Sequence, residues 1–253
     1  MQQAVIDNPV WLPADWPAPT CVRAGSTTSL SDISPDSSMD FNLAMHTGDN
    51  PGRVSANRSY LQNMLNLPAA PIWLRQVHGS RIITAGKDAT GDEADGCYSD
   101  QRGHVCAVLT ADCIPLMLCN REGSEIAAVH AGWRGLCNGV IENALGCFRS
   151  TPTEILAWVG PHICSRHYEV GSEVLNRCKE VYGAKAHTAF IATRPDHWQA
   201  DLGKLAEMAL SGCGITAMYS SGHCTFARTD LLYSYRRNRE GGRFASLIWI
   251  TPD

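Results

Sequence analysis

The sequence predicts an α/β or α+β fold, a single domain of mixed β-sheets flanked by helices. Short apolar runs of strand length occur at 104–110, 114–119 and 125–129, separated by polar or turn residues. Amphipathic helical patterns lie among these runs without the strict alternation of βαβ units, which favours mixed sheets. A length of 253 residues suits one large domain. We expect that domain to span residues 1–253, with 1–40 partly loop-like.

The first elements are a loop, a helix and two strands. Residues 24–40 are rich in Ser, Thr and Asp, which indicates a surface loop. Apolar side chains recur at near-helical spacing over 53–65 and predict a helix. Two short apolar runs, 71–77 and 81–86, predict strands on either side of His78.

The second half of the chain continues the mixture of helices and strands. An amphipathic pattern predicts a helix over 136–148. Ser172 is a candidate N-cap for a helix over 171–183, and Asp201 is a candidate N-cap for a helix over 201–214. Apolar runs predict the remaining strands at 154–160 and 244–250.

The composition limits the partners and the setting of the protein. A net charge of −4 without a run of basic residues argues against nucleic acid and anionic membranes but leaves phosphate open as a ligand. No apolar run approaches membrane-span length, and the first residues lack the features of a signal peptide. Among the eleven cysteines, Cys106, Cys119 and Cys178 fall in core-like contexts. We therefore expect a cytoplasmic protein with reduced thiols.

Three residues that can bind a metal follow or separate the predicted strands. His78 ends one strand, Cys113 lies between two others, and His130 ends a fourth. Because the ends of neighbouring strands can converge at one sheet edge, these side chains can form one site. Two imidazoles and a thiolate suit Zn²⁺, and three protein ligands leave a fourth position for water or substrate. Asp112, beside Cys113, is a candidate supporting carboxylate or titrating group.

Two other interpretations of the same residues remain open. In the first, the histidines are only hydrogen-bonded and bind no metal, since the spacings match no local metal motif and histidines at strand ends are often of this kind. Alternatively, Cys113 is a nucleophile and His130 its general base, since such pairs are set by the fold rather than by sequence adjacency.

A small-residue turn adds a candidate anion site. Gly132 and Gly135 allow a tight strand-to-helix turn and close backbone approach. The backbone amides there, together with Arg134, would suit phosphate. Asn42 and Arg236 lie in further polar clusters and are weaker candidates for substrate contacts.

Several longer strings are more specific than any single spacing. From about residue 40 onward the sequence reads, in order, "FNLAMHTGDNPGRVSANR", "WLRQVHG", "TADCIPLMLCN", "AAVHAGWRGL", "GPHI…YEVGSEV" and "YSYRR…GRFASLIWI". Together they resemble the YfiH-type family, also called the polyphenol oxidase, laccase-domain or multicopper polyphenol oxidoreductase family. The resemblance implies a single-domain α/β fold with mixed sheets, similar to a bacterial toxin deamidase domain that uses a Cys–His pair.

The resemblance also implies a metal site and a range of activities. By motif, the ligands of zinc (or copper) are His78 of "QVHG", Cys113 of "ADC" and His130 of "HAGWRG". Members are described as enzymes that phosphorolyse adenosine, inosine, guanosine or methylthioadenosine and deaminate adenosine. Other bacterial members are linked to editing of peptidoglycan precursors, and an older description is laccase.

Residue chemistry limits these activities. A four-copper laccase needs about ten histidine ligands, many in His-X-His pairs. This chain has nine histidines and no such pair, so that mechanism does not fit. The zinc nucleobase deaminase signature is also missing, so deamination would use other groups. Two loops depart from the family pattern, near Ser29 and at Cys164, and substrate contacts from them do not carry over.

We therefore expect a zinc enzyme that acts on purine nucleosides and phosphate, as a monomer or weak homodimer. The expected metal ligands are His78, Cys113 and His130. The expected catalytic residues are Cys113, His130 and Asp112, and the expected substrate contacts are Asn42, Arg134 and Arg236. The alternatives are a metal-free cysteine hydrolase acting on a peptidoglycan precursor amide, and a metal-binding protein without catalysis. Oxidation of phenols with added copper would be a side activity of the same site.

Overall fold

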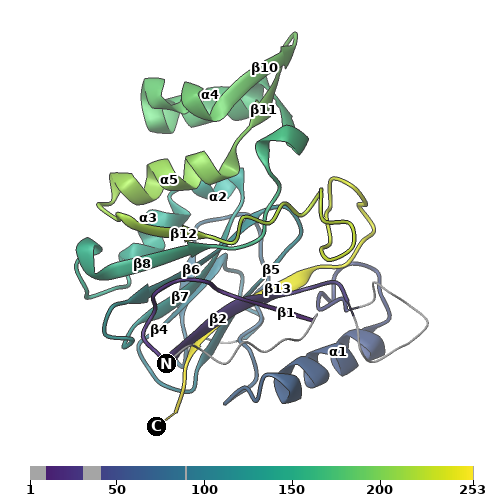
Figure 1. Cartoon of the computed structure of the whole chain (residues 1–253), viewed down its shortest axis with the longest axis vertical. Helices are drawn as coiled ribbons and strands as arrows, with labels where there is room; N and C mark the ends of the chain where they lie inside the picture. Colours follow the sequence, from purple (N-terminus) through teal and green to yellow (C-terminus); the bar gives the residue numbers. More distant parts are fainter. Residues whose placement is uncertain (1–9, 31–40, 89, 253) are drawn as a thin grey trace.

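The computed structural model describes residues 10–30, 41–88 and 90–252, which form three β-sheets and five α-helices (Figure 1). The strands are β1 (Trp11–Pro13), β2 (Val22–Thr27), β3 (Ile82–Thr84), β4 (Gly96–Ser99), β5 (Val105–Thr110), β6 (Ile114–Asn120), β7 (Ile126–Ala131), β8 (Ile155–Val159), β9 (Glu169–Gly171), β10 (Phe190–Arg194), β11 (His197–Ala200), β12 (Ala217–Ser220) and β13 (Phe244–Ile250). The helices are α1 (Pro51–Met64), α2 (Trp133–Cys137), α3 (Val140–Leu145), α4 (Ser172–Tyr182) and α5 (Leu202–Gly212), with 3₁₀ helices η1 (Pro152–Glu154), η2 (Ser165–His167) and η3 (Gly183–Ala189).

The sheets combine antiparallel and parallel strands. A four-stranded antiparallel sheet has the order β1-β2-β13-β5, and a six-stranded sheet has the order β12-β8-β6-β7-β4-β3. In the six-stranded sheet the two outer pairs, β12–β8 and β3–β4, are parallel, whereas the inner pairs are antiparallel. A small antiparallel sheet has the order β10-β11-β9. The prediction of a single α/β domain with mixed sheets is confirmed.

The two larger sheets pack face to face, and strand β6 shows how. Its side chains alternate between the two faces of the sheet, as in any strand. Met117 and Cys119 join a cluster with Cys106 and Ile248 of the four-stranded sheet, while Leu118 belongs to the cluster on the opposite face. Because both faces are buried, the strand has a continuous apolar sequence rather than an alternating one.

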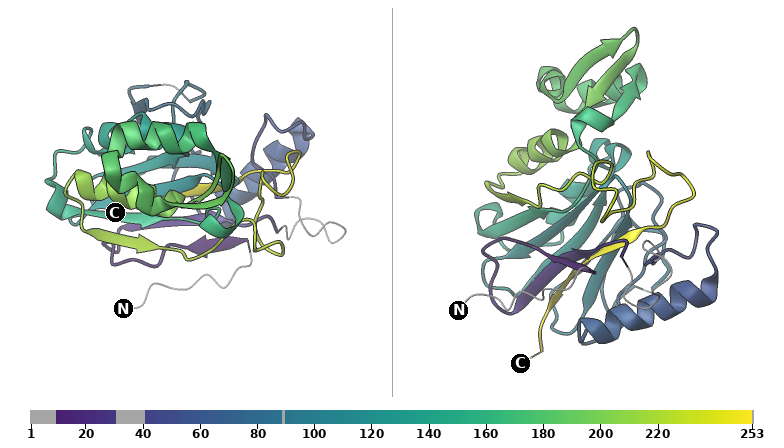
Figure 2. Two further views of the ribbon diagram at one scale, coloured as in Figure 1. Left: turned by 90° about the horizontal axis from the view of Figure 1, so that it is seen from above. Right: turned by 45° about the vertical axis from the view of Figure 1, so that its right-hand side comes forward.

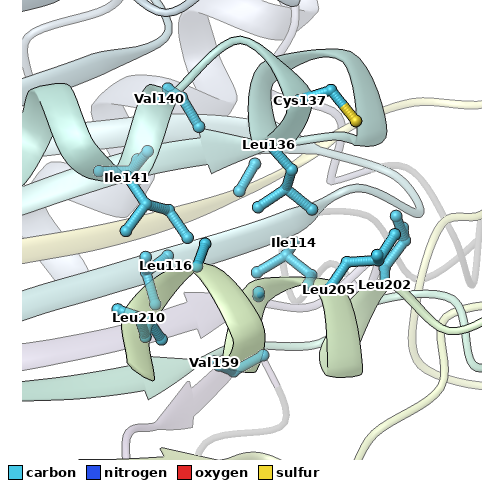
Figure 3. Packing of buried hydrophobic residues seen from close by; sticks show 14 of the residues in the cluster. Ile114, Leu116, Leu136, Cys137, Val140, Ile141, Val159, Leu202, Leu205 and Leu210 are labelled. Carbon is cyan, nitrogen blue, oxygen red and sulfur yellow. The ribbon is translucent and has the colours of Figure 1, made fainter. Parts of the chain in front are cut away.

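Helices cover the outer faces of this pair of sheets. On the six-stranded side, Leu136 of α2, Ile141 of α3 and Leu205 of α5 pack in one cluster with Leu116 of β6 (Figure 3). On the four-stranded side, Leu61 of α1 packs in a cluster with residues of β5 and β13. Helix α4 and strands β10 and β11 extend beyond α5 at one end of the molecule (Figures 1 and 2). None of the described helices has both the length and the apolarity that a membrane span requires.

Most of the predicted elements are confirmed. Helix α1 lies over the expected 53–65, and α5 begins after Asp201, whose carboxylate accepts a hydrogen bond from the backbone N–H of Lys204 at 3.0 Å. The buried strands β5, β6, β7, β8 and β13 coincide with predicted apolar runs, and β3 falls within the predicted 81–86. Cys106, Cys119 and Cys178 are fully buried, as expected of small hydrophobes.

The surface loop expected over 24–40 is wrong at its start. Residues 22–27 form strand β2, which pairs with both β1 and β13. Gly25 leaves room for a neighbour, since a Cβ atom there would lie 2.4 Å from the Trp11 indole. The polar residues of this strand are not exposed, since Ser26 and Thr27 are fully buried. Residues 31–40 lie outside the described part of the chain.

Other predicted elements also need correction. Residues 71–77 form only isolated bridges, at Ile72 and Arg75, rather than a strand. The helix expected over 136–148 is two short helices, since Gly139 between them adopts φ 78°. Ser172 is the first residue of α4 and not its N-cap. The N-cap is Gly171, which has no side chain to cap the helix. The short strands β1, β4 and β9 to β12 carry no clear apolar pattern and were not predicted.

Candidate active site and metal centre

The fold brings His78, Cys113 and His130 together. One potential ligand atom from each lies within 4.8 Å of the other two. His130 is in β7, Cys113 directly precedes β6, and His78 lies in a turn with φ 57°. The two imidazole rings have centroids 4.7 Å apart and planes inclined by 67°. The three donors therefore surround one point, although they come from three separate segments.

Two glycines make this approach feasible. Strands β6 and β7 are antiparallel neighbours, so Cys113 before β6 lies beside Gly132 after β7. A Cβ atom on Gly132 would lie 2.9 Å from Sγ of Cys113 and 3.0 Å from Nδ1 of His78. A Cβ atom on Gly135 would lie 3.1 Å from the carbonyl oxygen of Gly79. Any side chain at these positions would push the donor groups or the His78 turn out of place.

A buried carboxylate that sequence reasoning missed holds both histidines. Asp95 is fully buried, and its Oδ1 lies 2.7 Å from Nδ1 of His130. The same carboxylate accepts hydrogen bonds from the backbone N–H groups of His78 at 3.0 Å and Gly79 at 2.6 Å. Its only sequence signal is an Asp-Gly pair at the start of β4, after an acidic stretch that resembles an ordinary loop.

The environment favours ionised forms of Cys113 and His130. Burial raises the pKa of Cys113, but the charge of His130 and hydrogen bonds from both histidines outweigh it and lower that pKa to about 6. Burial lowers the pKa of His130, but the Cys113 thiolate and the Asp95 carboxylate raise it to about 9. Both pKa shifts favour the thiolate form of Cys113 and the imidazolium form of His130.

The donor set fits a single Zn²⁺ ion. Two imidazoles and one thiolate are typical ligands of catalytic zinc, with a fourth position open. Because Asp95 engages Nδ1 of His130, the Nε2 atom of that ring is left for a metal, as in carboxylate–histidine–zinc arrangements. A single copper ion would also accept these soft ligands.

His78, Cys113 and His130, called the trio below, line a cavity of about 790 Å³ that is rich in arginine and aromatic side chains. The arginines are Arg134, Arg236, Arg239 and Arg243, and the aromatic residues are Trp133, Tyr168 and Tyr235. Among the described residues, none of these arginines forms an ion pair with a carboxylate, and Asp112 is the one acidic residue lining the cavity. The electrostatic potential in the cavity therefore favours anions.

His46 also lines this cavity and adds no positive charge at neutral pH. Burial, followed by the charges of Arg243 and Arg58, lowers the pKa of His46. The ring is neutral at pH 7 and can accept as well as donate a hydrogen bond.

Asp112 uses both carboxylate oxygens in contacts within the protein. Oδ1 accepts from Oγ1 of Thr225 at 2.6 Å, and Oδ2 accepts from the backbone N–H of Arg236 at 2.6 Å. Asp112 itself adopts φ 102°, a left-handed conformation that these contacts stabilise. The contacts support a positioning role for Asp112, which fixes the chain on both sides of the cavity.

The predicted substrate contacts divide between two cavities. Arg134 lies over the Trp133 ring at 4.5 Å, and Arg236 lies 5.2 Å from the Tyr168 ring while donating to the backbone oxygen of Glu169. Both line the cavity of the trio.

Asn42 does not line that cavity but a neighbouring one of about 710 Å³. Its side chain is nearly fully buried and hydrogen-bonded to Asp49 and Thr47, and its Oδ1 accepts from the backbone N–H of Arg243 at 2.9 Å. Asn42 thus reaches the trio's cavity only indirectly, by fixing Arg243. Arg239, Arg243, Tyr168 and Tyr235 were not singled out from the sequence, because distant loops bring them to the cavity.

Fold and site together define a class: an α/β protein with a His₂Cys donor set in a cationic cavity. The chain belongs to the family described as multi-copper polyphenol oxidoreductase laccase, whose model matches residues 23–251.

The similar proteins cover nearly the whole chain. It is 44% identical over 236 residues to a protein of Escherichia coli K12 named purine nucleoside phosphorylase YfiH, covering 93% of this chain and 96% of that one. It is 41% identical over 241 residues to a purine nucleoside phosphorylase of Pseudomonas aeruginosa, covering 95% and 98%. A crystal structure of a Neisseria meningitidis protein superposes with a TM-score of 0.90 at 38% identity, covering 96% of this chain and 100% of that one.

The donor atoms do not fit the copper content in the family's description. Within the described residues, the groups able to hold a metal ion are the trio and one further group of two cysteines and a histidine. A multi-copper oxidase needs a blue-copper site and a histidine-rich copper cluster. The two groups present supply three histidines in all, so electron transfer through several coppers has no structural basis here.

Proposed function

We propose that this chain is a zinc-dependent purine nucleoside enzyme that phosphorolyses adenosine, inosine, guanosine or methylthioadenosine and also deaminates adenosine. One observation carries the proposal: the His78, Cys113 and His130 donors line the same cavity as four arginines and three aromatic side chains. Nucleoside phosphorolysis needs an anion site and a site for a flat aromatic base side by side. The names of the similar proteins support the same class of substrate.

Phosphate would be held by the cavity arginines. Guanidinium groups bind phosphate oxygens with paired, charge-assisted hydrogen bonds. Arg134 and Arg239 are exposed and lack a carboxylate partner among the described residues, so both are available to an anion. In the reaction, a phosphate oxygen bonds to C1′ of the ribose while the glycosidic bond breaks, and the purine leaves with the electron pair and takes up a proton.

The purine would pack against the aromatic residues of the cavity. Tyr168, Tyr235 and Trp133 offer ring faces, and an arginine lies over one face of each, namely Arg236, Arg243 and Arg134 in the same order. Stacking on such rings tolerates different purines, because every base has a π-face. The cavity therefore suits a broad rather than a single nucleoside specificity.

His78, Cys113 and His130 would hold the zinc ion, with Asp95 orienting His130. When bound, zinc supplies a Lewis acid that can polarise the substrate or lower the pKa of a water molecule. Asp112 would keep Arg236 in place through its backbone contact. For deamination, water would add at C6 of adenine and ammonia would leave. His46, neutral and in the same cavity, can accept or donate a proton.

Metal analysis followed by product analysis tests the proposal. Purified protein is expected to carry zinc and to release base from inosine and adenosine only when phosphate is present. Inosine formed from adenosine without phosphate would demonstrate the deaminase activity. His78→Ala is expected to abolish both reactions, while Lys204→Ala on the outer helix α5 leaves them unchanged. Full turnover by zinc-free protein and by His78→Ala would refute the proposal.

The second candidate function is a metal-free cysteine hydrolase acting on an amide of a peptidoglycan precursor. The lowered pKa of Cys113 beside His130 favours it, because a thiolate is the reactive form of cysteine. It predicts stoichiometric alkylation of Cys113, full activity in the presence of a chelator, and no requirement for His78. Phenol oxidation, if seen only with added copper, would be a side activity of the same donors.

We further infer a cytoplasmic setting and a monomer or weak homodimer that does not bind nucleic acid. None of the eleven cysteines is in a disulfide, which is compatible with a reducing compartment. Sedimentation at increasing protein concentration tests the oligomeric state. A concentration-independent larger oligomer would contradict this inference.

A further inference from the structure

A second group of soft donor atoms shares no residue with the trio. Cys164, His167 and Cys224 each offer one ligand atom, and these atoms lie within 4.8 Å of one another. Cys164 directly precedes the 3₁₀ helix η2, which ends at His167, whereas Cys224 comes from the segment after β12. All three side chains are half-buried, so an ion from solvent can reach them.

The distances in this group match those of a zinc site. Nδ1 of His167 lies 3.3 Å from Sγ of Cys164 and 3.6 Å from Sγ of Cys224. With Zn–S bonds of about 2.3 Å, a Zn–N bond of about 2.0 Å and tetrahedral angles, the expected sulfur–nitrogen separation is about 3.5 Å. The donors would need little movement to bind an ion.

The surroundings hold one thiol and the imidazole in place. The backbone N–H of Cys164 donates to Sγ of Cys224 at 3.3 Å. The His167 ring stacks on Phe226, with centroids 4.5 Å apart and planes inclined by 20°. Such contacts around metal ligands set their orientation.

We propose that Cys164, His167 and Cys224 bind a second Zn²⁺ ion, separate from the trio, with its fourth position open to solvent. On binding, each thiol that is protonated releases its proton to water, and no electron is transferred. The proposal does not depend on which reaction the trio supports.

This site would connect two segments that border the candidate active site. The backbone N–H of Ile163, next to Cys164, donates to the backbone carbonyl oxygen of Asp112 at 3.0 Å. The hydroxyl of Thr225, next to Cys224, donates to the Asp112 carboxylate at 2.6 Å. Tyr168, which follows His167, lines the cavity of the trio. A bound ion would therefore stiffen one wall of that cavity and stabilise the folded chain by mass action.

Zinc content of matched variants tests the proposal. Protein is purified under reducing conditions, supplied with Zn²⁺, dialysed and analysed for zinc per chain. Cys224→Ser and Cys164→Ser are each expected to carry one zinc fewer than the parent, whereas Cys147→Ser, a half-buried cysteine outside both groups, loses none. Circular dichroism checks that each variant is folded, and two variants are used in case one is not.

The same variants in a His78→Ala background separate the two sites. There, Co²⁺ is expected to give the near-ultraviolet charge-transfer band of thiolate coordination, and Cys224→Ser removes that band. If the trio binds no zinc, His78→Ala loses none while Cys224→Ser still loses one, so the two proposals fail independently. Unchanged zinc content in both cysteine variants would overturn the proposal, as would a Cys164–Cys224 disulfide in freshly purified protein.

Discussion

The carboxylate of Asp95 lies 2.7 Å from Nδ1 of His130 and also binds the turn that carries His78. One buried side chain therefore orients one candidate ligand directly and the other through its backbone. His78 adopts φ 57°, which the hydrogen bonds from its own N–H and that of Gly79 to Asp95 stabilise. Asp95 thus connects the segments that carry the two imidazoles.

Asp95→Asn is expected to weaken zinc binding by about 10- to 100-fold, as for other residues that orient metal ligands. The amide keeps the size of the side chain but presents an NH₂ group to the N–H donors of the turn and removes the charge beside His130. Competition with a chromophoric chelator measures the affinity. Glu93→Gln, an exposed neighbour on the same loop, serves as the control and should bind zinc like the parent. Equal affinities in the two variants would show that Asp95 does not act on the site.

Gly132→Ala is expected to abolish zinc binding at the trio with little loss of fold. The added methyl group would lie within about 3 Å of two donor atoms, closer than carbon contacts allow. Gly212→Ala, at the end of α5, is the matched control, because its added Cβ meets no atom within 4 Å. Zinc per chain and thermal unfolding are measured for both. Normal zinc content in Gly132→Ala would contradict the close approach.

The trio could be predicted from the sequence, whereas the Asp95 carboxylate that orients its histidines could not. Strands buried on both faces have continuous apolar runs, so the polar residues at their ends, such as Cys113 and His130, are conspicuous. Asp95 precedes a four-residue strand with no such run, and its contacts lie 16 to 35 residues away in the chain. The polar strand β2 was missed for a related reason: Gly25 is there to admit the Trp11 ring, a non-local requirement that residue pattern does not reveal.

The cavity could be anticipated only in part. Arg134 was identifiable because it follows the glycine turn directly. Arg243 reaches the cavity through a loop that Asn42 holds, 201 residues away in sequence. Asn42 was a candidate as part of a polar cluster, but only the structure shows that its side chain positions Arg243.

Arg134→Ala is expected to raise the KM for phosphate by about tenfold, equivalent to about 1.4 kcal/mol of binding free energy. The guanidinium lies at the cavity and has no carboxylate partner among the described residues, so its removal leaves no buried charge unpaired. The KM for nucleoside and any deamination without phosphate should change much less. Arg177→Ala on α4, where the arginine pairs with Glu180, is the control. A similar rise in both variants, or a loss confined to kcat, would argue against phosphate binding by Arg134.

Glu125→Gln is expected to destabilise the fold in a pH-dependent way. The buried carboxylate accepts from Tyr98 Oη at 2.7 Å and from the backbone N–H groups of Arg149 at 2.8 Å and Ser150 at 3.1 Å. Burial raises the pKa of Glu125, but these hydrogen bonds lower it below the ordinary value. A lowered pKa in the folded state means that the carboxylate stabilises the fold above the unfolded pKa of about 4.3 and that this contribution is lost as the pH falls below it.

The substitution should therefore reduce the free energy of unfolding at pH 7 by about 1–3 kcal/mol, the usual cost of leaving buried donors poorly satisfied. The difference between parent and variant should narrow below about pH 4, where the parent also loses its charge. Urea denaturation at a series of pH values measures both quantities. Glu207→Gln, an exposed carboxylate on α5, should match the parent throughout. A deficit in Glu125→Gln that stays constant from neutral to acid pH would mean that the charge of Glu125 contributes nothing, and that only its shape and its hydrogen-bond geometry stabilise this corner of the sheet.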